Sequence, residues 1–241
     1  MNEDLDSIQF SLIKDFKYEQ WFEETQYNGN TLSDTERKEL IVVIDETIDQ
    51  YSKGLPLYYD ILKNNKDLND EYHITYCTVV SVMLFVQITM IDSMVASKYF
   101  LLADKDYDRR YMRGKLMVIL NEGFKQLYGF EKNSKKTKWD SLSRVMNVFP
   151  EEVIQQFQRL STLLEKHATT SSWWKEERDF ETHLDAEKLY ESRQKEIIES
   201  KVMIDSVKLF NTLYAVDQFL TNMHKCLFNY MVLKYKQGEI K

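Results

Sequence analysis

The sequence predicts an all-α protein in which amphipathic helices pack into one bundle. Glycine and proline are scarce, with 6 and 2 residues among 241, which argues against an all-β or Rossmann-like chain. Charged residues make up 29% of the chain and aromatic residues 13%, as is typical of a soluble globular protein with a substantial core. Neither a linker nor an internal repeat interrupts the pattern, so we expect a single helical domain over residues 1–241.

The first 69 residues are expected to form an N-terminal extension and a helix. Ser33 and Glu36 have the spacing of a capping box, which marks a helix start. Apolar residues then follow at helical intervals: Ile41, Ile44, Ile48 and Tyr51. Gly54 and Pro56 are expected to end this helix.

A long apolar helix is predicted from about Glu71 to Ala103. Its stretch from Tyr72 to Ile91 carries no formal charge, which raises the question of a membrane span. Polar residues are nevertheless spread through it: His73, Thr75, Thr78, Ser81, Gln87 and Thr89. We therefore interpret it as a buried bundle helix and expect no membrane association.

Three further helices are predicted after this one. Aspartates at 104, 106 and 108 mark a break, and the next helix ends near Gly129. Its apolar face comprises Met112, Leu116, Ile119, Gly123 and Leu127. Pro150 has the position of a first-turn proline, and the helix that it opens ends in the polar run 169–172. The last helix, roughly 187–236, carries a bundle seam: Leu209, Leu213, Val216, Leu220, Met223, Leu227 and Tyr230.

The net charge of −7 argues against nonspecific binding of duplex DNA, because neutralising the DNA phosphates requires an excess of basic residues. A nucleic-acid site would have to be local, and two basic stretches, 109–115 and 132–139, are candidates as well as ordinary solvated surface. The residues that we single out as RNA contacts are Arg109, Arg110, Arg113, Lys115 and Lys175.

The two cysteines, Cys77 and Cys226, lie in apolar helical patterns, where cysteine behaves as a small hydrophobic residue. The N-terminus is acidic and lacks the features of a secretory signal, so we expect a cytoplasmic protein. A carboxylate-bridged dimetal site needs Glu three residues before His, but these positions hold Asp70, Leu164, Phe180 and Thr221. Phosphate-loop and nucleophile-elbow motifs are also absent from the sequence, so no metal or cofactor is expected.

The most informative stretch begins at Trp173 and contains Arg178, Asp179 and His183, an Arg-x4-His spacing. A neutral imidazole can take a proton from a ribose 2′-hydroxyl, and a guanidinium can hold the charge of a phosphorane. The same spacing also arises by chance between solvated residues of an Arg- and Glu-rich helix. Residues five apart on an ideal helix lie about 140° apart. Either the helix is broken between Arg178 and His183, or the site is shared across a two-fold dimer.

The segment from Trp173 to about Asn229 resembles the C-terminal half of a HEPN domain (higher eukaryote and prokaryote nucleotide-binding). That family's signature is an Arg, a polar residue, a short spacer and a His before a long amphipathic helix, and 178–183 fit it. Asp179 stands where the family often has Asn. The segment 109–130 resembles preceding helices of uncharacterised bacterial members.

The resemblance implies an up-and-down four-helix bundle over residues 70–241, with additional N-terminal helices in 1–69. It also implies a homodimer in which Arg178 and His183 of both copies line one groove and cut RNA without a metal ion. Two hypotheses remain. The first is a HEPN-type endoribonuclease of a toxin or defence system, with unstructured RNA as substrate and a cognate antitoxin as partner. The second is a non-catalytic interaction protein, which the acidic net charge and Asp179 favour.

Overall fold

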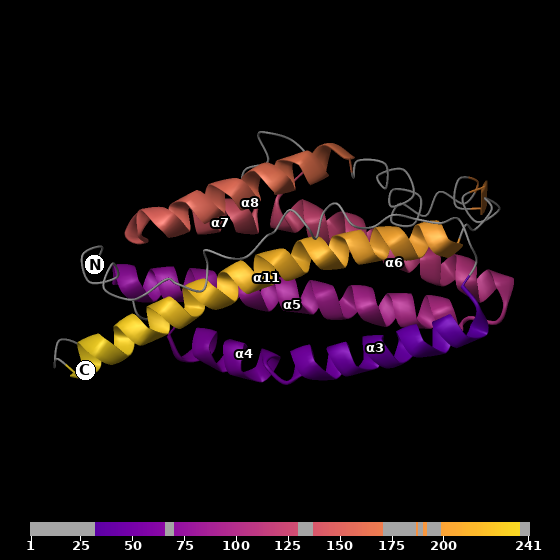
Figure 1. Ribbon diagram of the computed structural model, residues 1–241, viewed down its shortest axis with the longest axis horizontal. Helices are drawn as coiled ribbons and strands as arrows, with labels where there is room; N and C mark the ends of the chain where they lie inside the picture. Colours follow the sequence, from indigo (N-terminus) through magenta and orange to yellow (C-terminus); the bar gives the residue numbers. More distant parts are fainter. Residues whose placement is uncertain are drawn as a thin grey trace.

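The computed structural model describes residues 32–65, 70–129, 137–170, 187, 190, 191 and 199–236. Every regular element within these ranges is a helix, which confirms the all-α prediction (Figure 1). The elements are α3 (Asp34–Ser52), α4 (Leu55–Asn64), α5 (Glu71–Leu102), α6 (Asp106–Leu127), α7 (Lys138–Ser143), the 3-10 helix η1 (Met146–Val148), α8 (Glu151–Thr170) and α11 (Glu199–Lys236).

Helix α3 begins and ends where the sequence predicts. The Glu36 amide donates to the Ser33 hydroxyl, and the Glu36 carboxylate accepts from the Ser33 amide, so the predicted capping box is confirmed. The prediction was incomplete at the other end, since a second helix, α4, follows Gly54 at once. Pro56 lies in the first turn of α4, where a missing N–H costs no hydrogen bond.

Helix α5 is the centre of the molecule, with α3, α4, α6, α7 and α11 packed around it. Its start is capped by Asp70, whose side chain accepts from the His73 amide. Buried hydroxyls on α5 donate to carbonyls of the same helix, as Thr75 does to Glu71. With a mean hydropathy of 2.0 over its most apolar 18 residues, α5 could span a membrane by length and composition alone. A helix that neighbours cover on most sides has the same composition.

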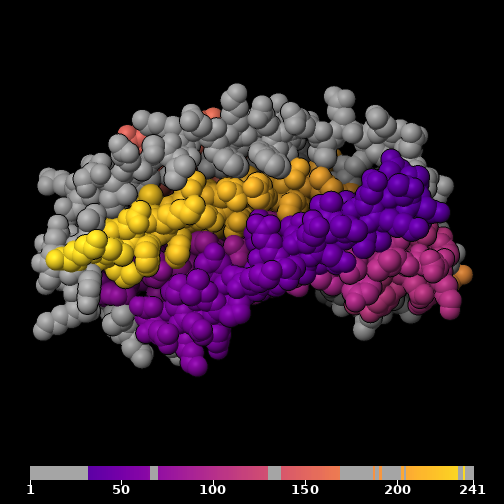
Figure 2. Space-filling view, turned by 60° about the horizontal axis from the view of Figure 1, so that its bottom comes forward, coloured from indigo at the N-terminus to yellow at the C-terminus, as the bar shows by residue number. Residues whose placement is uncertain are grey.

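The long helices alternate in direction along the chain (Figure 1). Helices α3 and α4 run one way, α5 returns, and α6, α8 and α11 continue the alternation. The antiparallel pairing of α5 with α11 is seen in their hydrogen bonds, because partners at increasing positions on α5 lie at decreasing positions on α11. These bonds are Tyr72–Leu227, Gln87–Asp217 and Ser97–Ser206. Figure 2 shows α3 and α4 along one side of the bundle and a hollow between α4 and α6.

Helix α6 approaches α5 closely through a glycine. A Cβ placed on Gly123 would lie 2.5 Å from the Thr89 methyl group, so the contact requires a residue without a side chain. The chain leaves α6 through Gly129, whose φ of 88° lies in the left-handed region. Both glycines lie where the sequence analysis placed an apolar face and a helix end.

Helices α7 and α8 pack through aromatic rings. Trp139 stacks on Phe157 with ring centroids 4.6 Å apart, and its indole N–H donates to the Ser161 hydroxyl. Trp139 is 5% exposed, so this end of the basic stretch 132–139 belongs to the core and the surface interpretation was wrong there. Pro150 was predicted in the first turn of this helix, but it directly precedes α8. Its carbonyl accepts a hydrogen bond from the Ile154 amide.

The predicted seam of the last helix is confirmed. Leu213, Leu220 and Leu227 are fully buried, and the other seam positions are nearly so. The described part of α11 begins at Glu199, and residues 187, 190 and 191 are also helical. Ile44 on α3 joins the same hydrophobic core as α5 and α11, so the described N-terminal helices pack into the bundle and not apart from it.

Candidate functional site

The Arg-x4-His motif lies outside the described residues. This applies to Arg178, Asp179 and His183, and also to Lys175. Helix α8 ends at Thr170, before the motif, and the last long helix follows it. The position and geometry of the pair therefore stay a prediction.

The arginines of the basic stretch on α6 are held by neighbouring groups. Arg109 donates from Nη2 to the Ala103 carbonyl at 3.1 Å. Arg110 donates from Nε to the Asp106 carboxylate at 2.8 Å, one helical turn away. Both side chains are partly buried, so their guanidinium groups are already engaged within the protein.

The remaining basic residues of this stretch differ in exposure. Arg113 is partly buried, and Lys115 is exposed with its ammonium 5.2 Å from the centre of the Tyr111 ring. Acidic residues lie close by in sequence at 104, 106 and 108. RNA would meet a surface of mixed charge here, with Lys115 as its most accessible cation.

A buried carboxyl group, which the sequence analysis missed, lies between α5 and α11. Asp217 is 3% exposed and accepts a hydrogen bond of 2.8 Å from the side-chain amide of Gln87. Burial raises the pKa of Asp217 to about 6, and the bond from Gln87 opposes this rise only in part. The available signal was a polar residue inside an apolar pattern, since Gln87 interrupts α5 and Asp217 adjoins the seam residue Val216.

Tyr51 and Tyr58 lie near this carboxyl group, and a histidine lies two helical turns further along α11. Burial raises the pKa of Tyr51, and the negative charge of Asp217 raises it further. His224 stacks on Tyr76, whose hydroxyl lies 3.0 Å from His224 Nε2, and burial lowers the pKa of the imidazole. His224 thus lies in the α5–α11 interface. Because Asp217 is closed to solvent, this cluster offers a substrate no access.

A second half-buried histidine, His167 of α8, packs against α6. The His167 ring contacts Phe124 with centroids 5.0 Å apart. Burial lowers the pKa of His167 to about 4, and the charge of Lys208 adds to this effect. The imidazole is therefore neutral at physiological pH, and its protonation at low pH lowers the free energy of unfolding.

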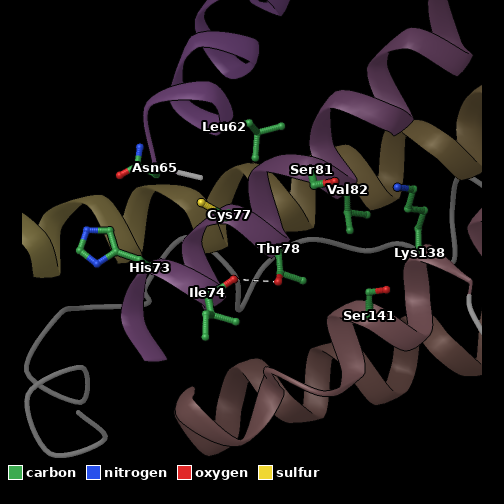
Figure 3. A pocket seen from close by; sticks show the side chains of 10 residues that line it. All are labelled: Leu62, Asn65, His73, Ile74, Cys77, Thr78, Ser81, Val82, Lys138 and Ser141. Carbon is green, nitrogen blue, oxygen red and sulfur yellow. Dashed lines mark hydrogen bonds between the residues drawn. The ribbon is translucent and has the colours of Figure 1, made fainter. Parts of the chain in front are cut away.

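An open groove lies between α4, α5 and α7 (Figure 3). It encloses about 470 Å³, with Leu62 and Asn65 of α4 on one side and Lys138 and Ser141 of α7 on the other. Its floor is formed by α5 through His73, Ile74, Cys77, Thr78, Ser81 and Val82.

Two side chains of the groove could take part in chemistry. His73 is bonded through Nδ1 to the Asp70 carboxylate at the start of α5, a contact that orients the imidazole. Burial raises the pKa of the Cys77 thiol, which therefore stays protonated at neutral pH and is a poor nucleophile. Among the described residues, no three His, Cys, Asp or Glu side chains gather as a metal site.

Comparison with known proteins does not assign the chain to a family. No protein-family model, no curated protein and no solved structure matches it. Its function has to be argued from its own residues.

Proposed function

We propose that this chain is a HEPN-like protein that cuts RNA without a metal ion, with Arg178 and His183 as the reacting pair. The observation that carries the proposal is the place of the motif, after α8 and before the last long helix. The alternating directions of α5, α6, α8 and α11 support an up-and-down bundle, in which α3 and α4 would be additional helices.

The chemistry follows from the two side chains. His183 takes the proton from a ribose 2′-hydroxyl as the oxygen attacks in line, and Arg178 stabilises the charge on the equatorial phosphate oxygens. Unstructured RNA is the substrate, because its 2′-hydroxyl reaches in-line geometry more readily than in a duplex. Two copies contribute Arg178 and His183 to one groove. The protein acts in the cytoplasm as a toxin or defence effector that a cognate partner restrains.

A non-catalytic interaction protein is the second candidate, and exposed apolar side chains favour it. On α3, Val42 and Val43 are 55% and 56% exposed, and on α4, Leu57 and Tyr59 are 60% and 59% exposed. Apolar groups gathered on one pair of helices are typical of surfaces that contact another protein.

The test is RNA cutting in the presence of a chelator. Purified protein should cut an unstructured RNA and leave DNA of the same sequence intact, since DNA lacks the attacking hydroxyl. His183→Ala should reduce the rate by roughly 10²–10⁴-fold through loss of proton transfer. Arg178→Ala should reduce it by a comparable factor through loss of charge stabilisation. Both variants should keep the wild-type melting temperature.

His73→Ala is the matched control, because this imidazole is bonded to the capping residue of α5 and lies away from the motif in sequence. It should lower the melting temperature and spare turnover. Activity that survives His183→Ala, or that falls equally in all three variants, would refute the assignment. A wild-type protein that cuts no RNA would favour the interaction protein.

A further inference from the structure

One face of α5 is not covered by any of the other helices that the structure describes. Its residues recur at alternating spacings of four and three, which places them along one side of the helix. This α5 stripe comprises Ile74, Thr78, Ser81, Phe85, Ile88, Asp92, Val95, Tyr99 and Leu102. It includes large apolar side chains in contact with water, since Ile88 is 41% exposed and Tyr99 is 55% exposed. At 1.5 Å per residue the stripe is roughly 42 Å long.

Two helices flank the α5 stripe. On one side α3 is tied to α5 by the ion pair of Lys98 with Asp45. On the other side α6 meets α5 at Gly123 and Thr89. Lys98 and Thr89 lie about a quarter turn to either side of Ile88 around the helix, so α3 and α6 flank α5 at about its own height and leave the α5 stripe open between them.

The two ends of the α5 stripe have opposite shapes. The N-terminal end forms the floor of the groove between α4 and α7, around Ile74 and Thr78. The C-terminal end carries projecting side chains, with Tyr99 55% and Leu102 47% exposed. A second α5 in the opposite direction would bring its projecting end over this groove.

The charges along the α5 stripe are also placed in a complementary way. Asp92 is an exposed carboxylate four residues after Ile88. The Lys138 ammonium lies 5.7 Å from the centre of the Phe85 ring, three residues before Ile88. Neither Asp92 nor Lys138 forms an ion pair with any residue that the structure describes.

We propose that two copies of this chain associate through the α5 stripe, antiparallel, about a two-fold axis at Ile88. With this axis, a residue that lies a given number of positions after Ile88 in one copy faces the residue that lies the same number of positions before Ile88 in the other copy. Asp92 of one copy then faces the Phe85 region of the other, where Lys138 lies, and the symmetry forms this ion pair twice. Tyr99 and Leu102 enter the groove of the second copy over Thr78 and Ile74.

A second copy fits better than an unrelated helix for a physical reason. An isologous interface requires one surface to carry both a feature and its complement, at equal distances from the axis. The α5 stripe does this twice, with groove and projecting side chains at its ends and with Lys138 and Asp92 near its centre. The inference goes beyond the proposed RNA cutting and uses neither Arg178 nor His183.

Charge reversal tests the proposal through molecular mass, measured by light scattering after size exclusion. The full-length chain, of 28.9 kDa, should elute at twice that mass at micromolar concentration. Asp92→Lys alone and Lys138→Glu alone should each raise the dimer dissociation constant at least tenfold, because two like-charged pairs then face each other. An equimolar mixture of the two variants should regain the dimer, because each unlike pair is restored across the axis.

Glu152→Lys is the matched control, because it reverses an exposed carboxylate on α8 away from the α5 stripe and should leave the dimer intact. A monomeric wild type would overturn the proposal and would also leave the Arg178 and His183 groove of the proposed function without its second copy. A dimer that persists in both single variants would place the interface elsewhere and would refute the α5 stripe alone. A mixture that stays monomeric, although both variants keep the wild-type melting temperature, would also refute the predicted pairing.

Discussion

Replacing Asp217 by asparagine should stabilise the protein at neutral pH. The Asp217 carboxyl is 3% exposed, and its pKa is raised from 3.8 to about 6, chiefly by burial. The folded protein therefore binds this proton more tightly than the unfolded chain does. The contribution of Asp217 to the free energy of unfolding is fully present below pH 3.8 and is lost as the pH rises through 6.

The magnitude follows from the two pKa values. Each pKa unit corresponds to about 1.4 kcal/mol, so the carboxylate form costs the folded state about 3 kcal/mol at pH 7.5. Asparagine is neutral at every pH and still offers an oxygen to the Gln87 amide. Asp217→Asn should exceed the wild type in unfolding free energy by up to about 3 kcal/mol at pH 7.5 and by roughly half of that at pH 5.

Urea unfolding followed by far-ultraviolet circular dichroism measures this difference, provided that the denaturant slope is unchanged by the substitution. Asp60→Asn on α4 is the control, because that carboxylate is exposed and its removal should change little at either pH. An Asp217→Asn protein that is less stable than the wild type at pH 7.5 would refute the reasoning. So would a difference that fails to narrow between pH 7.5 and pH 5.

Two further substitutions test the buried contacts. His167 has the opposite effect, because its pKa is lowered from 6.5 to about 4 in the folded protein. Its contribution to the free energy of unfolding is complete above pH 6.5 and is lost as the pH falls toward 4. Between pH 7 and pH 5 the unfolding free energy of the wild type should therefore fall by about 2 kcal/mol more than that of His167→Gln, as measured by urea unfolding. Equal falls in the two proteins would contradict this prediction. Gly123→Ala should destabilise by about 1–3 kcal/mol through collision with the Thr89 methyl group. In a Thr89→Ser background, which lacks this methyl group, Gly123→Ala should become neutral or stabilising. A loss of unfolding free energy that persists in that background would exclude the Thr89 methyl group as its cause.

Local signals explain the part of the fold that could be predicted from sequence. Caps and apolar periodicity depend on neighbouring residues, so the start of α3, the end of α6 and the seam of α11 were located correctly. Aspartates 106 and 108, which were expected in a break, lie in the first turn of α6. Helix α4 was missed because Pro56 can either end a helix or open one, and the sequence does not distinguish these cases. Helix α7 has only 6 residues, too few to show a period, and the lysines before it suggested surface.

The functional residues were harder to predict. The Arg-x4-His pair was proposed from residue types alone, because imidazole and guanidinium chemistry is readable from sequence, and it lies outside the described residues. Asp217 was not found, since its pKa depends on burial by helices that are distant along the chain. The α5 stripe has a heptad period, but α5 is apolar on nearly every side, and only the packed neighbours reveal which face is left open.

The central position of α5 has a consequence for how the protein unfolds. Helices α3, α4, α6, α7 and α11 all pack on α5, and their contacts with one another are fewer. Loss of α5 would deprive each of them of its main apolar partner at the same moment. No fragment that lacks residues 71–102 retains the principal packing partner of α3, α4, α6, α7 and α11. The bundle should thus melt in one cooperative transition, and a protease cut within α5 should release unstructured fragments and not a smaller folded core.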